Sequence, residues 1–249
     1  MEFPVQVFEA VPSTNDTIRK SAEEGAPEGT THIARTQTHG RGREGRAWWS
    51  PPGAGLWMST LLRPAARREV WSGLALVSGA AVVRALSRLG VRGVELEWPN
   101  DVVVGGRKLG GILCEVGGRG GDAWIALGIG VNIDLTTPEA RDLMPDELRE
   151  RVTCMTREGP PSATAPEEVA RAILEELGPL YERFVGGEKT AEIIGAYLGA
   201  PGQRVEVSQP GGNGLRGTVA GLGADGELQV MDDEGRLHTI VTGEVRYER

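Results

Sequence analysis

The chain has 249 residues, of which 39% are hydrophobic, and it carries 35 acidic against 27 basic side chains for a formal net charge of -8. This length and apolar content suffice for one large and one small globular domain with a real core. The acidic balance disfavours DNA, and two cysteines without metal spacing exclude a disulfide framework. Because the N-terminus lacks a signal pattern and no apolar run approaches membrane-spanning length, we expect a soluble cytoplasmic protein without a membrane partner.

The first part of the chain predicts three strands, a helix and a long loop. Ser13 followed three residues later by Asp16 has the form of a capping box, which predicts a helix that ends at Gly25. The polar residues Ser13, Thr14 and Asn15 either cap this helix or present donors and acceptors to the polar head of a ligand. The predicted strands are residues 5–10, 31–37 and 55–62.

The stretch of residues 35–49, in which the predicted strand 31–37 leads into a loop rich in glycine and arginine, is the most distinctive part of the sequence. Three glycines, which let the backbone turn sharply and approach a ligand, are interleaved with three arginines, so we expect an anionic ligand here. The glycine spacing formally matches a dinucleotide fingerprint, but Trp48-Trp49-Ser50-Pro51 cannot open the helix that this fingerprint requires. A nucleic-acid-binding segment is disfavoured because the basic cluster is confined to one loop. The six residues are Gly40, Arg41, Gly42, Arg43, Gly45 and Arg46.

The middle of the chain predicts a packed helix and strands joined by tight turns. Apolar residues recur at helical spacing over residues 70–89, and Gly90 closes the helix. The turn Gly105-Gly106 reverses the chain into a hairpin whose returning arm carries Lys108. Successive strands with tight turns imply a mainly antiparallel sheet. The predicted strands are residues 94–98, 102–104, 107–116 and 123–133.

The rest of the chain predicts helices followed by a small barrel. The polar stretch after the last of these strands is expected to be variable surface structure, with a short helical piece around residues 146–155. A helix begins at Pro166 and ends at Gly186, and a shorter helix covers residues 190–198. Five short strands follow, so a second domain begins near Pro201. They are residues 203–207, 215–222, 227–231, 237–241 and 245–247.

Lys108 becomes a candidate catalytic residue through a rigid corner that precedes it; without that corner it is an ordinary surface charge. Pro99 leads into Asn100-Asp101, and the hairpin folds Lys108 back towards this pair. Joining a carboxylate to the α-phosphate of ATP requires such fixed cations, because negative charge accumulates as the bond forms. Mg²⁺ would help to neutralise the departing pyrophosphate, with Asp101 or Asn132 as its candidate ligands.

In order and spacing, these motifs resemble biotin protein ligase, and the C-terminal segment resembles the SH3-like domain of that family. The resemblance implies a mixed α/β (α+β) fold. Residues 1–199 would form a catalytic domain related to class II aminoacyl-tRNA synthetases, with a mainly antiparallel sheet, and residues 200–249 a small SH3-like β-barrel. The motifs are Ser13-Thr14-Asn15, the segment from Gln37 to Trp48, Trp98-Pro99-Asn100-Asp101 with Arg107-Lys108-Leu109-x-Gly111, and Gly128-Ile129-Gly130-Val131-Asn132.

The resemblance further implies a two-step ligase. Biotin and ATP would give biotinyl-5′-adenylate, and a lysine of the biotin carboxyl carrier protein would then attack that mixed anhydride and release AMP. Arg43 would restrain the phosphate, Lys108 would contact biotin's carboxylate and the α-phosphate, and Trp48 would exclude water, with Asp101 as a third catalytic residue. The residues implied to bind biotin are Ser13, Thr14, Asn15, Gln37, Gly40, Arg41, Gly42, Arg43, Trp48, Lys108 and Gly111. Those implied to bind the nucleotide are Arg43, Arg46, Trp48, Asn100, Lys108 and Asn132.

Two features depart from the pattern of this family. Its members often carry a lysine directly before Trp-Pro-Asn-Asp, where this chain has Glu97. The stretch before the catalytic domain is too short for the helix-turn-helix of bifunctional members, so we expect no operator binding and no nucleic-acid partner. The sequence leaves open whether the protein forms a homodimer.

Two other functions compete with this interpretation. A lipoate or octanoyl transferase shares the fold, but those families lack the Gly-Arg-Gly-Arg loop, and the transferases typically use a cysteine nucleophile. Cys114 is expected on a buried strand and Cys154 in the variable stretch. An inactive module that senses biotin or regulates a carboxylase is supported only by Glu97.

Overall fold

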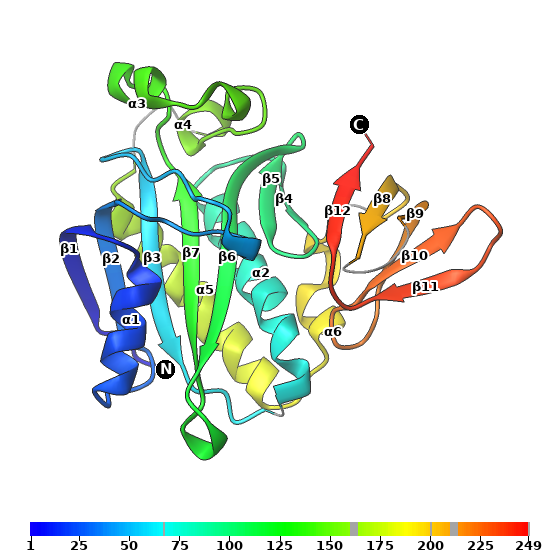
Figure 1. Ribbon diagram of the computed structural model, residues 1–249, viewed down its shortest axis with the longest axis horizontal. Coiled ribbons are helices and arrows are strands. Elements are labelled where there is room, and N and C mark those ends of the chain that lie inside the picture. The colour runs from blue at the N-terminus through cyan, green and yellow to red at the C-terminus, as the bar shows by residue number, and fades with distance from the viewer. Residues whose placement is uncertain (67, 160–163, 200, 210–213, 249) are drawn as a thin grey trace.

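The computed structural model describes residues 1–66, 68–159, 164–199, 201–209 and 214–248, which form two β-sheets and several helices (Figure 1). The larger sheet has seven strands in the order β1-β2-β3-β7-β6-β5-β4. Strands β1 and β2 run parallel and the other neighbouring pairs antiparallel, which confirms the expected mixed α/β fold with a mainly antiparallel sheet. The strands are β1 (Val5–Val11), β2 (Thr31–Gln37), β3 (Gly55–Leu62), β4 (Val94–Glu97), β5 (Asp101–Val104), β6 (Arg107–Gly117) and β7 (Trp124–Asn132).

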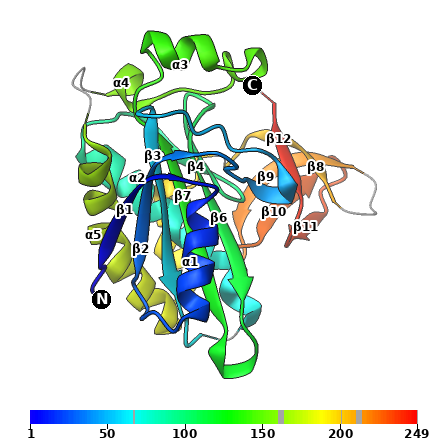
Figure 2. The ribbon, with the colours of Figure 1, turned by 60° about the vertical axis from the view of Figure 1, so that its left-hand side comes forward.

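Helices cover both faces of the larger sheet (Figures 1 and 2). Helix α1 (Thr14–Glu23) connects β1 to β2, because parallel strands need a crossover rather than a tight turn. On the opposite face, α2 (Leu74–Arg88) and α5 (Pro166–Val185) lie side by side. Neighbouring residues of β3 divide between the two faces, since Leu62 packs into the core with α2 and α5 whereas Leu61 packs with α1.

Helix α2 is strongly apolar, and most of its side chains are buried. It is preceded by a 3-10 turn over Arg68–Gly73, so the α-helix begins later than expected. By length and composition alone Arg68–Arg88 would be apolar enough to cross a membrane, contrary to our reading of the sequence. However, 72% of its most apolar window is buried inside the protein, so core packing accounts for this composition.

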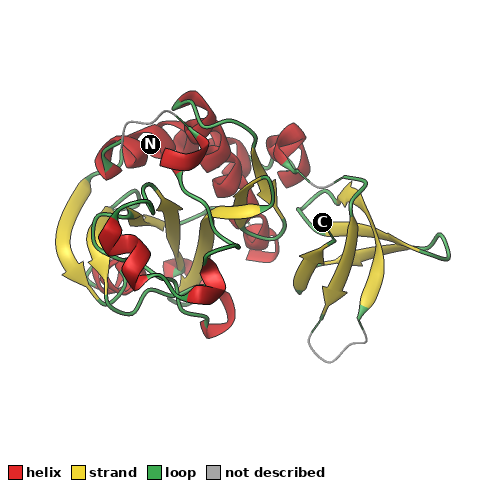
Figure 3. Cartoon of the chain, turned by 90° about the horizontal axis from the view of Figure 1, so that it is seen from above, coloured by secondary structure: helices red, strands yellow, loops and turns green. Residues whose placement is uncertain are grey.

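A second, five-stranded sheet lies beside the larger one (Figure 3). Its strands pair antiparallel in the order β11-β10-β9-β8-β12, and they follow the five predicted segments closely. Two hydrogen bonds join it to the corner between β4 and β5: the Trp98 indole N–H donates to the Gly226 carbonyl at 2.9 Å, and the Tyr247 hydroxyl donates to the Trp98 carbonyl at 3.3 Å. The strands are β8 (Arg204–Ser208), β9 (Leu215–Leu222), β10 (Leu228–Asp232), β11 (Leu237–Ile240) and β12 (Glu244–Tyr247).

The start of α1 lies where the sequence predicted it, but the predicted capping box is wrong. Ser13 occupies the N-cap position with an extended backbone, yet its side chain makes no capping hydrogen bond. The Asp16 carboxylate turns away from the helix terminus and pairs with Arg19 and Arg41 instead. The short polar side chains at the start of α1 are therefore available for another role.

The stretch between β7 and α5 contains more helix than expected. Helix α3 (Pro138–Leu143) is capped by Thr137, whose side chain accepts a hydrogen bond from the Ala140 N–H. The expected helical piece around residues 146–155 is a 3-10 turn followed by the single-turn α4 (Met155–Glu158). Helix α6 (Thr190–Ile194) is also shorter than predicted and is followed by a 3-10 turn.

The packing of α2 gives a prediction for stability. Leu86 is fully buried, so Leu86→Ala leaves a cavity and should lower the free energy of unfolding by about 2–5 kcal/mol. The exposed neighbour Ser87 provides the control, because Ser87→Ala should change it by less than about 0.5 kcal/mol. Urea titration of both variants measures the difference, and equal effects would contradict the assigned burial.

Candidate active site

A cavity of about 830 Å³ lies between the glycine and arginine loop, the larger sheet and β12. This volume falls in the range of small-molecule and cofactor sites. The cavity brings together both ends of the predicted site, the loop arginines and the lysine of the hairpin. The predicted site residues that line it are Ser13, Thr14, Asn15, Gln37, Arg41, Gly42, Arg43, Arg46, Trp48, Asn100, Asp101, Lys108 and Gly111.

The residues before and at the start of α1 form a buried polar wall of this cavity. Ser13, Thr14 and Asn15 are at most 4% exposed. The backbone N–H of Thr14 donates to Gln37 Oε1 at 2.8 Å, and Ser59 Oγ lies 2.6 Å from Thr14 Oγ1 and 2.5 Å from Asn15 Oδ1. Buried hydrogen-bonded groups of this kind can recognise a polar ligand with fixed geometry.

Arg41 differs from the other two arginines of the loop because two partly buried carboxylates hold its guanidinium. Its guanidinium donates two hydrogen bonds of 2.9 Å to Asp16 and one of 3.2 Å to Glu115. Hydrogen bonding to Arg41 holds the pKa of Asp16 below its usual value. The Arg41 side chain therefore links the loop to α1 and β6. Arg43 and Arg46 remain the candidates for binding an anionic ligand.

Arg43 and Arg46 face the second sheet. Arg43 makes two long hydrogen bonds of 3.4 Å, to Asn100 Oδ1 and to the Gly243 carbonyl, and Arg46 pairs with Glu244 at 2.7 Å. Long hydrogen bonds and exposed ion pairs are weak, so an anionic ligand can replace them at little cost. These contacts with the second sheet place the part of the loop that carries Arg43 and Arg46 at the wall of the cavity.

Lys108 lies against the predicted corner. Its Nζ is 2.6 Å from Asp101 Oδ1 and 5.2 Å from the ring centre of Trp48. A β-bulge between Val102 and Val103 shifts the register of β5 against β6 at this place. Carboxylate and ammonium meet here, as the corner and hairpin predicted, and both remain about one-third exposed.

Glycines of β6 and β7 form the floor on which Trp48 lies. A Cβ atom at Gly130 would be 2.7 Å from Trp48 Cε2, and one at Gly111 would be 3.0 Å from Trp48 Cζ3. A Cβ at Gly128 would be 2.6 Å from Asn15 Oδ1. Glycine in a strand interior marks a close approach, a signal that could have assigned roles to Gly128 and Gly130.

Two predicted residues do not line the cavity. Asn132 is 5% exposed, and its amide donates to the carbonyls of Thr153 at 3.0 Å and Lys108 at 3.4 Å. Gly40 is surrounded by the loop itself, since a Cβ there would lie 2.5 Å from the Trp48 carbonyl. The geometry gives both a supporting position, in which Asn132 anchors the backbone of the hairpin that carries Lys108.

Sequence reasoning missed Ser59, Glu115 and Glu244. The position of Glu115 could have been predicted from the sequence. Residues 111, 113 and 115 share one face of a strand, and Gly111 was already assigned to the site. Ser59 carries no such signal. Glu244 belongs to a different sheet, and its place beside Arg46 depends on how the two sheets meet.

Neither cysteine lines the cavity. Cys114 packs against the core on the face of β6 that α2 and α5 cover, where burial raises the pKa of its thiol to about 12. Cys154 is fully buried in a separate cluster. Among the described residues, no group of three or more His, Cys, Asp or Glu side chains is placed to hold a metal ion.

Comparison with known proteins places these features in a family. Residues 7–132 match the model of the Biotin/lipoate A/B protein ligase family. A biotin--[acetyl-CoA-carboxylase] ligase of Mycobacterium tuberculosis is 31% identical over 95% of this chain and 86% of that protein, and one of Paracoccus denitrificans is 33% identical over 82% and 85%. The match to the bifunctional ligase/repressor BirA of Bacillus spizizenii, 35% identical, spans 60% of this chain and 45% of that protein.

The same similarity extends to solved structures. Biotin protein ligase from Aquifex aeolicus in complex with biotin and ATP superimposes with a TM-score of 0.82 and 28% identity, over 98% of each chain. The match therefore includes the second, smaller sheet as well as the larger one.

The ion pair of Arg41 gives a prediction for pH dependence. The pKa of Asp16 is lowered from 3.8 in the folded protein, so its stabilising contribution is present above that pH and is lost as the pH falls through the folded pKa. Asp16→Asn should therefore unfold more easily than wild type at neutral pH, and the difference should shrink below pH 3.8. Urea titrations across this range test the sign; a difference that grows on acidification would contradict it.

Proposed function

Because the chain belongs to the Biotin/lipoate A/B protein ligase family, we propose that it is an ATP-dependent biotin protein ligase. It would join biotin to AMP and then transfer biotin to a lysine of the biotin carboxyl carrier protein of a carboxylase. The observation that carries this proposal is the convergence of Arg43, Arg46 and Lys108 with the polar wall of α1 on one cavity.

The first step brings two anions together, the biotin carboxylate and the α-phosphate of ATP. Lys108 Nζ supplies a fixed positive charge for the negative charge that develops between them, and Asp101 at 2.6 Å holds this ammonium in place. Arg43 and Arg46 exchange their weak contacts with Asn100, Gly243 and Glu244 for the phosphates. The substrate carboxylate itself attacks phosphorus, so no protein nucleophile is needed.

The mixed anhydride must be kept from water until the acceptor amine arrives. The Trp48 indole covers the floor glycines Gly111 and Gly130 and lies beside Lys108, so it excludes water where the reacting atoms meet. Arg43 would hold the phosphate of the adenylate. In the second step the amine attacks the acyl carbon and AMP leaves.

Magnesium would enter as part of the nucleotide substrate, and the cavity fits an ion that uses few protein ligands. Mg²⁺ bound to phosphates commonly uses one or two carboxylates and keeps several waters. Asp101 lines the cavity and has a second oxygen beside the one that faces Lys108, whereas Asn132 does not line it. We therefore favour Asp101 for this role, in which the ion would offset charge on the departing pyrophosphate.

We also propose the division of the chain into a catalytic domain over residues 1–199 and an SH3-like domain over residues 200–249. The second sheet begins at Arg204, and its contacts with Trp98, Arg43 and Arg46 lie at the cavity. The smaller domain would thus help to hold the loop over bound nucleotide.

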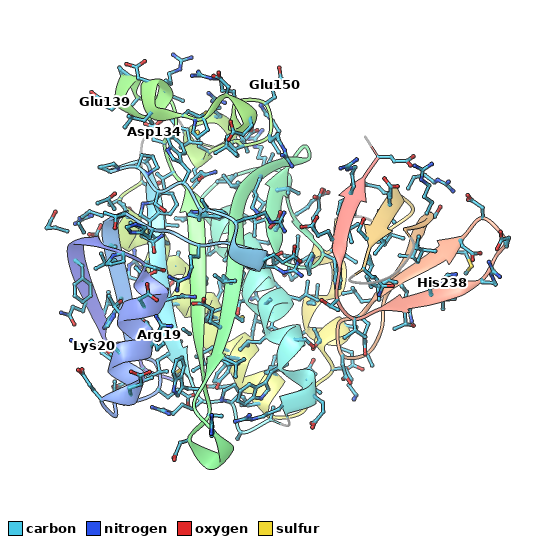
Figure 4. All side chains as sticks on the ribbon, in the orientation of Figure 1. Arg19, Lys20, Asp134, Glu139, Glu150 and His238 are labelled. Carbon is cyan, nitrogen blue, oxygen red and sulfur yellow. The ribbon has the colours of Figure 1, made fainter. Side chains whose placement is uncertain are left out.

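Isotope exchange between pyrophosphate and ATP tests the first step. We expect exchange that depends on biotin, and exchange with lipoate alone would support the related lipoate ligase instead. Lys108→Ala should slow exchange by about 10²–10³-fold with the fold intact, because one charge that stabilises the transition state is removed. Lys20, exposed on α1 (Figure 4), is the control, and Lys20→Ala should leave the rate unchanged. Equal rates for both variants would refute the role of Lys108.

Arg43→Gly tests retention of the intermediate. Without this guanidinium the adenylate should dissociate before transfer, so biotin should appear on unrelated proteins added to the mixture. Anti-biotin blotting of bovine serum albumin after incubation with biotin and ATP gives the measurement. Labelling confined to the carrier protein in both wild type and variant would remove Arg43 from this role.

A further inference from the structure

Glu115 is a charged residue that contacts the polar wall without lining the cavity. Its Oε2 accepts a hydrogen bond of 2.7 Å from Asn15 Nδ2 and one of 3.2 Å from Arg41. Asn15 lines the cavity and is 4% exposed, so Glu115 can influence a ligand through it. Any part that Glu115 plays in recognition is therefore that of a positioning residue.

The two ends of a primary amide have nearly the same shape, and hydrogen bonding decides which end faces which neighbour. An ionised carboxylate can only accept, so Glu115 requires the Nδ2 end of Asn15. The Oδ1 end then faces Ser59 Oγ at 2.5 Å, and Ser59 donates to it. Both ends of the Asn15 amide are thereby assigned.

Without Glu115 the opposite orientation of Asn15 would be equally well satisfied on its other side. Ser59 Oγ lies 2.6 Å from Thr14 Oγ1 as well as 2.5 Å from Asn15 Oδ1, and it has a single proton. If the amide turned over, Nδ2 would donate to Ser59, and Ser59 would donate to Thr14 instead. The carboxylate of Glu115 is thus the group that selects one orientation from two.

Gln37 in the same wall is fixed without a charge. Its Oε1 accepts from the backbone N–H of Thr14 at 2.8 Å, and its Nε2 donates to Ser50 Oγ at 3.1 Å. A backbone N–H can only donate, so the hydrogen bond from Thr14 by itself fixes the orientation of the Gln37 amide. Asn15 differs because, of its two side-chain partners among the described residues, Ser59 can donate or accept, whereas the Glu115 carboxylate can only accept.

We propose that Glu115 sets the hydrogen-bond polarity of Asn15 and thereby the preference of the cavity for a ring with a carbonyl acceptor flanked by N–H donors, the ureido group of biotin. This inference rests on the proposed function for the identity of the ligand. It adds a specificity-determining residue that does not touch the ligand. When the donors and acceptors of the polar wall are fixed, an analogue that has a donor in place of the carbonyl acceptor binds less well. Buried groups of the wall then remain unpaired.

The probe is 2-iminobiotin, in which an imino nitrogen replaces the ureido oxygen. Glu115→Gln keeps the shape of the side chain but offers both a donor and an acceptor, so Asn15 can take either orientation. Pyrophosphate exchange should show a KM for biotin raised about tenfold and a preference for biotin over 2-iminobiotin reduced about tenfold, with the KM for ATP changed less than about twofold.

Asp16→Asn is the matched control, since it removes the other carboxylate of Arg41 and leaves Asn15 untouched. It should keep the wild-type preference between the two ligands. A loss of preference equal to that of Glu115→Gln would mean that Glu115 acts through Arg41, and would overturn the inference.

A double variant covers the case in which Glu115→Gln alone fails to fold. Asn15→Asp with Glu115→Gln retains the hydrogen bond between the two side chains but reverses its direction. Its preference should shift towards 2-iminobiotin, and an unchanged preference in either variant would overturn the inference. Absence of biotin-dependent exchange in the wild type would instead refute the proposed function.

Discussion

The contact of the Trp48 indole with bare strand backbone is the constraint on which the rest of the site depends. Any side chain at Gly130 or Gly111 would occupy the space of this ring. Because the indole can lie flat on β6 and β7, the loop after β2 reaches across the sheet and Lys108 rests beside the ring. The cavity is thus bounded by a loop and a sheet whose close contact at Trp48 requires glycine in the facing strands.

The three loop arginines share a short sequence but differ in charge balance. Arg41 donates hydrogen bonds to both Asp16 and Glu115, so it anchors the loop. The contacts of Arg43 and Arg46 are long or exposed, and therefore weaker. A loop fixed at one arginine and loosely held at the next two can adjust to a ligand without detaching from the sheet. Glu115 on β6, which anchors Arg41, also bonds Asn15, so one carboxylate contacts both the loop and the polar wall of the cavity.

Much of the fold followed from local patterns. Strands β2 and β3 lie at the predicted residues, and the five strands of the second sheet follow their predicted segments closely, because alternation and turn residues act over a few positions. Helix boundaries were less predictable. The Ser13 side chain makes no capping hydrogen bond, and the Asp16 carboxylate pairs with Arg41, a partner distant in the sequence, rather than with the helix terminus. Helix α3 begins at a Thr-Pro pair inside a stretch that showed no clear periodicity.

The sequence by itself determined which residues could form the site. They are the glycine and arginine loop, the polar triplet at the start of α1, and the lysine on the hairpin that follows Pro99. These are properties of residue type and short spacing. Only the tertiary structure decided that Arg41 pairs with Asp16 and Glu115, that Asn132 supports a backbone rather than lining the cavity, and that Glu244 lies beside Arg46. Each of these depends on partners brought together by strand order and by the meeting of two sheets, which no local pattern encodes.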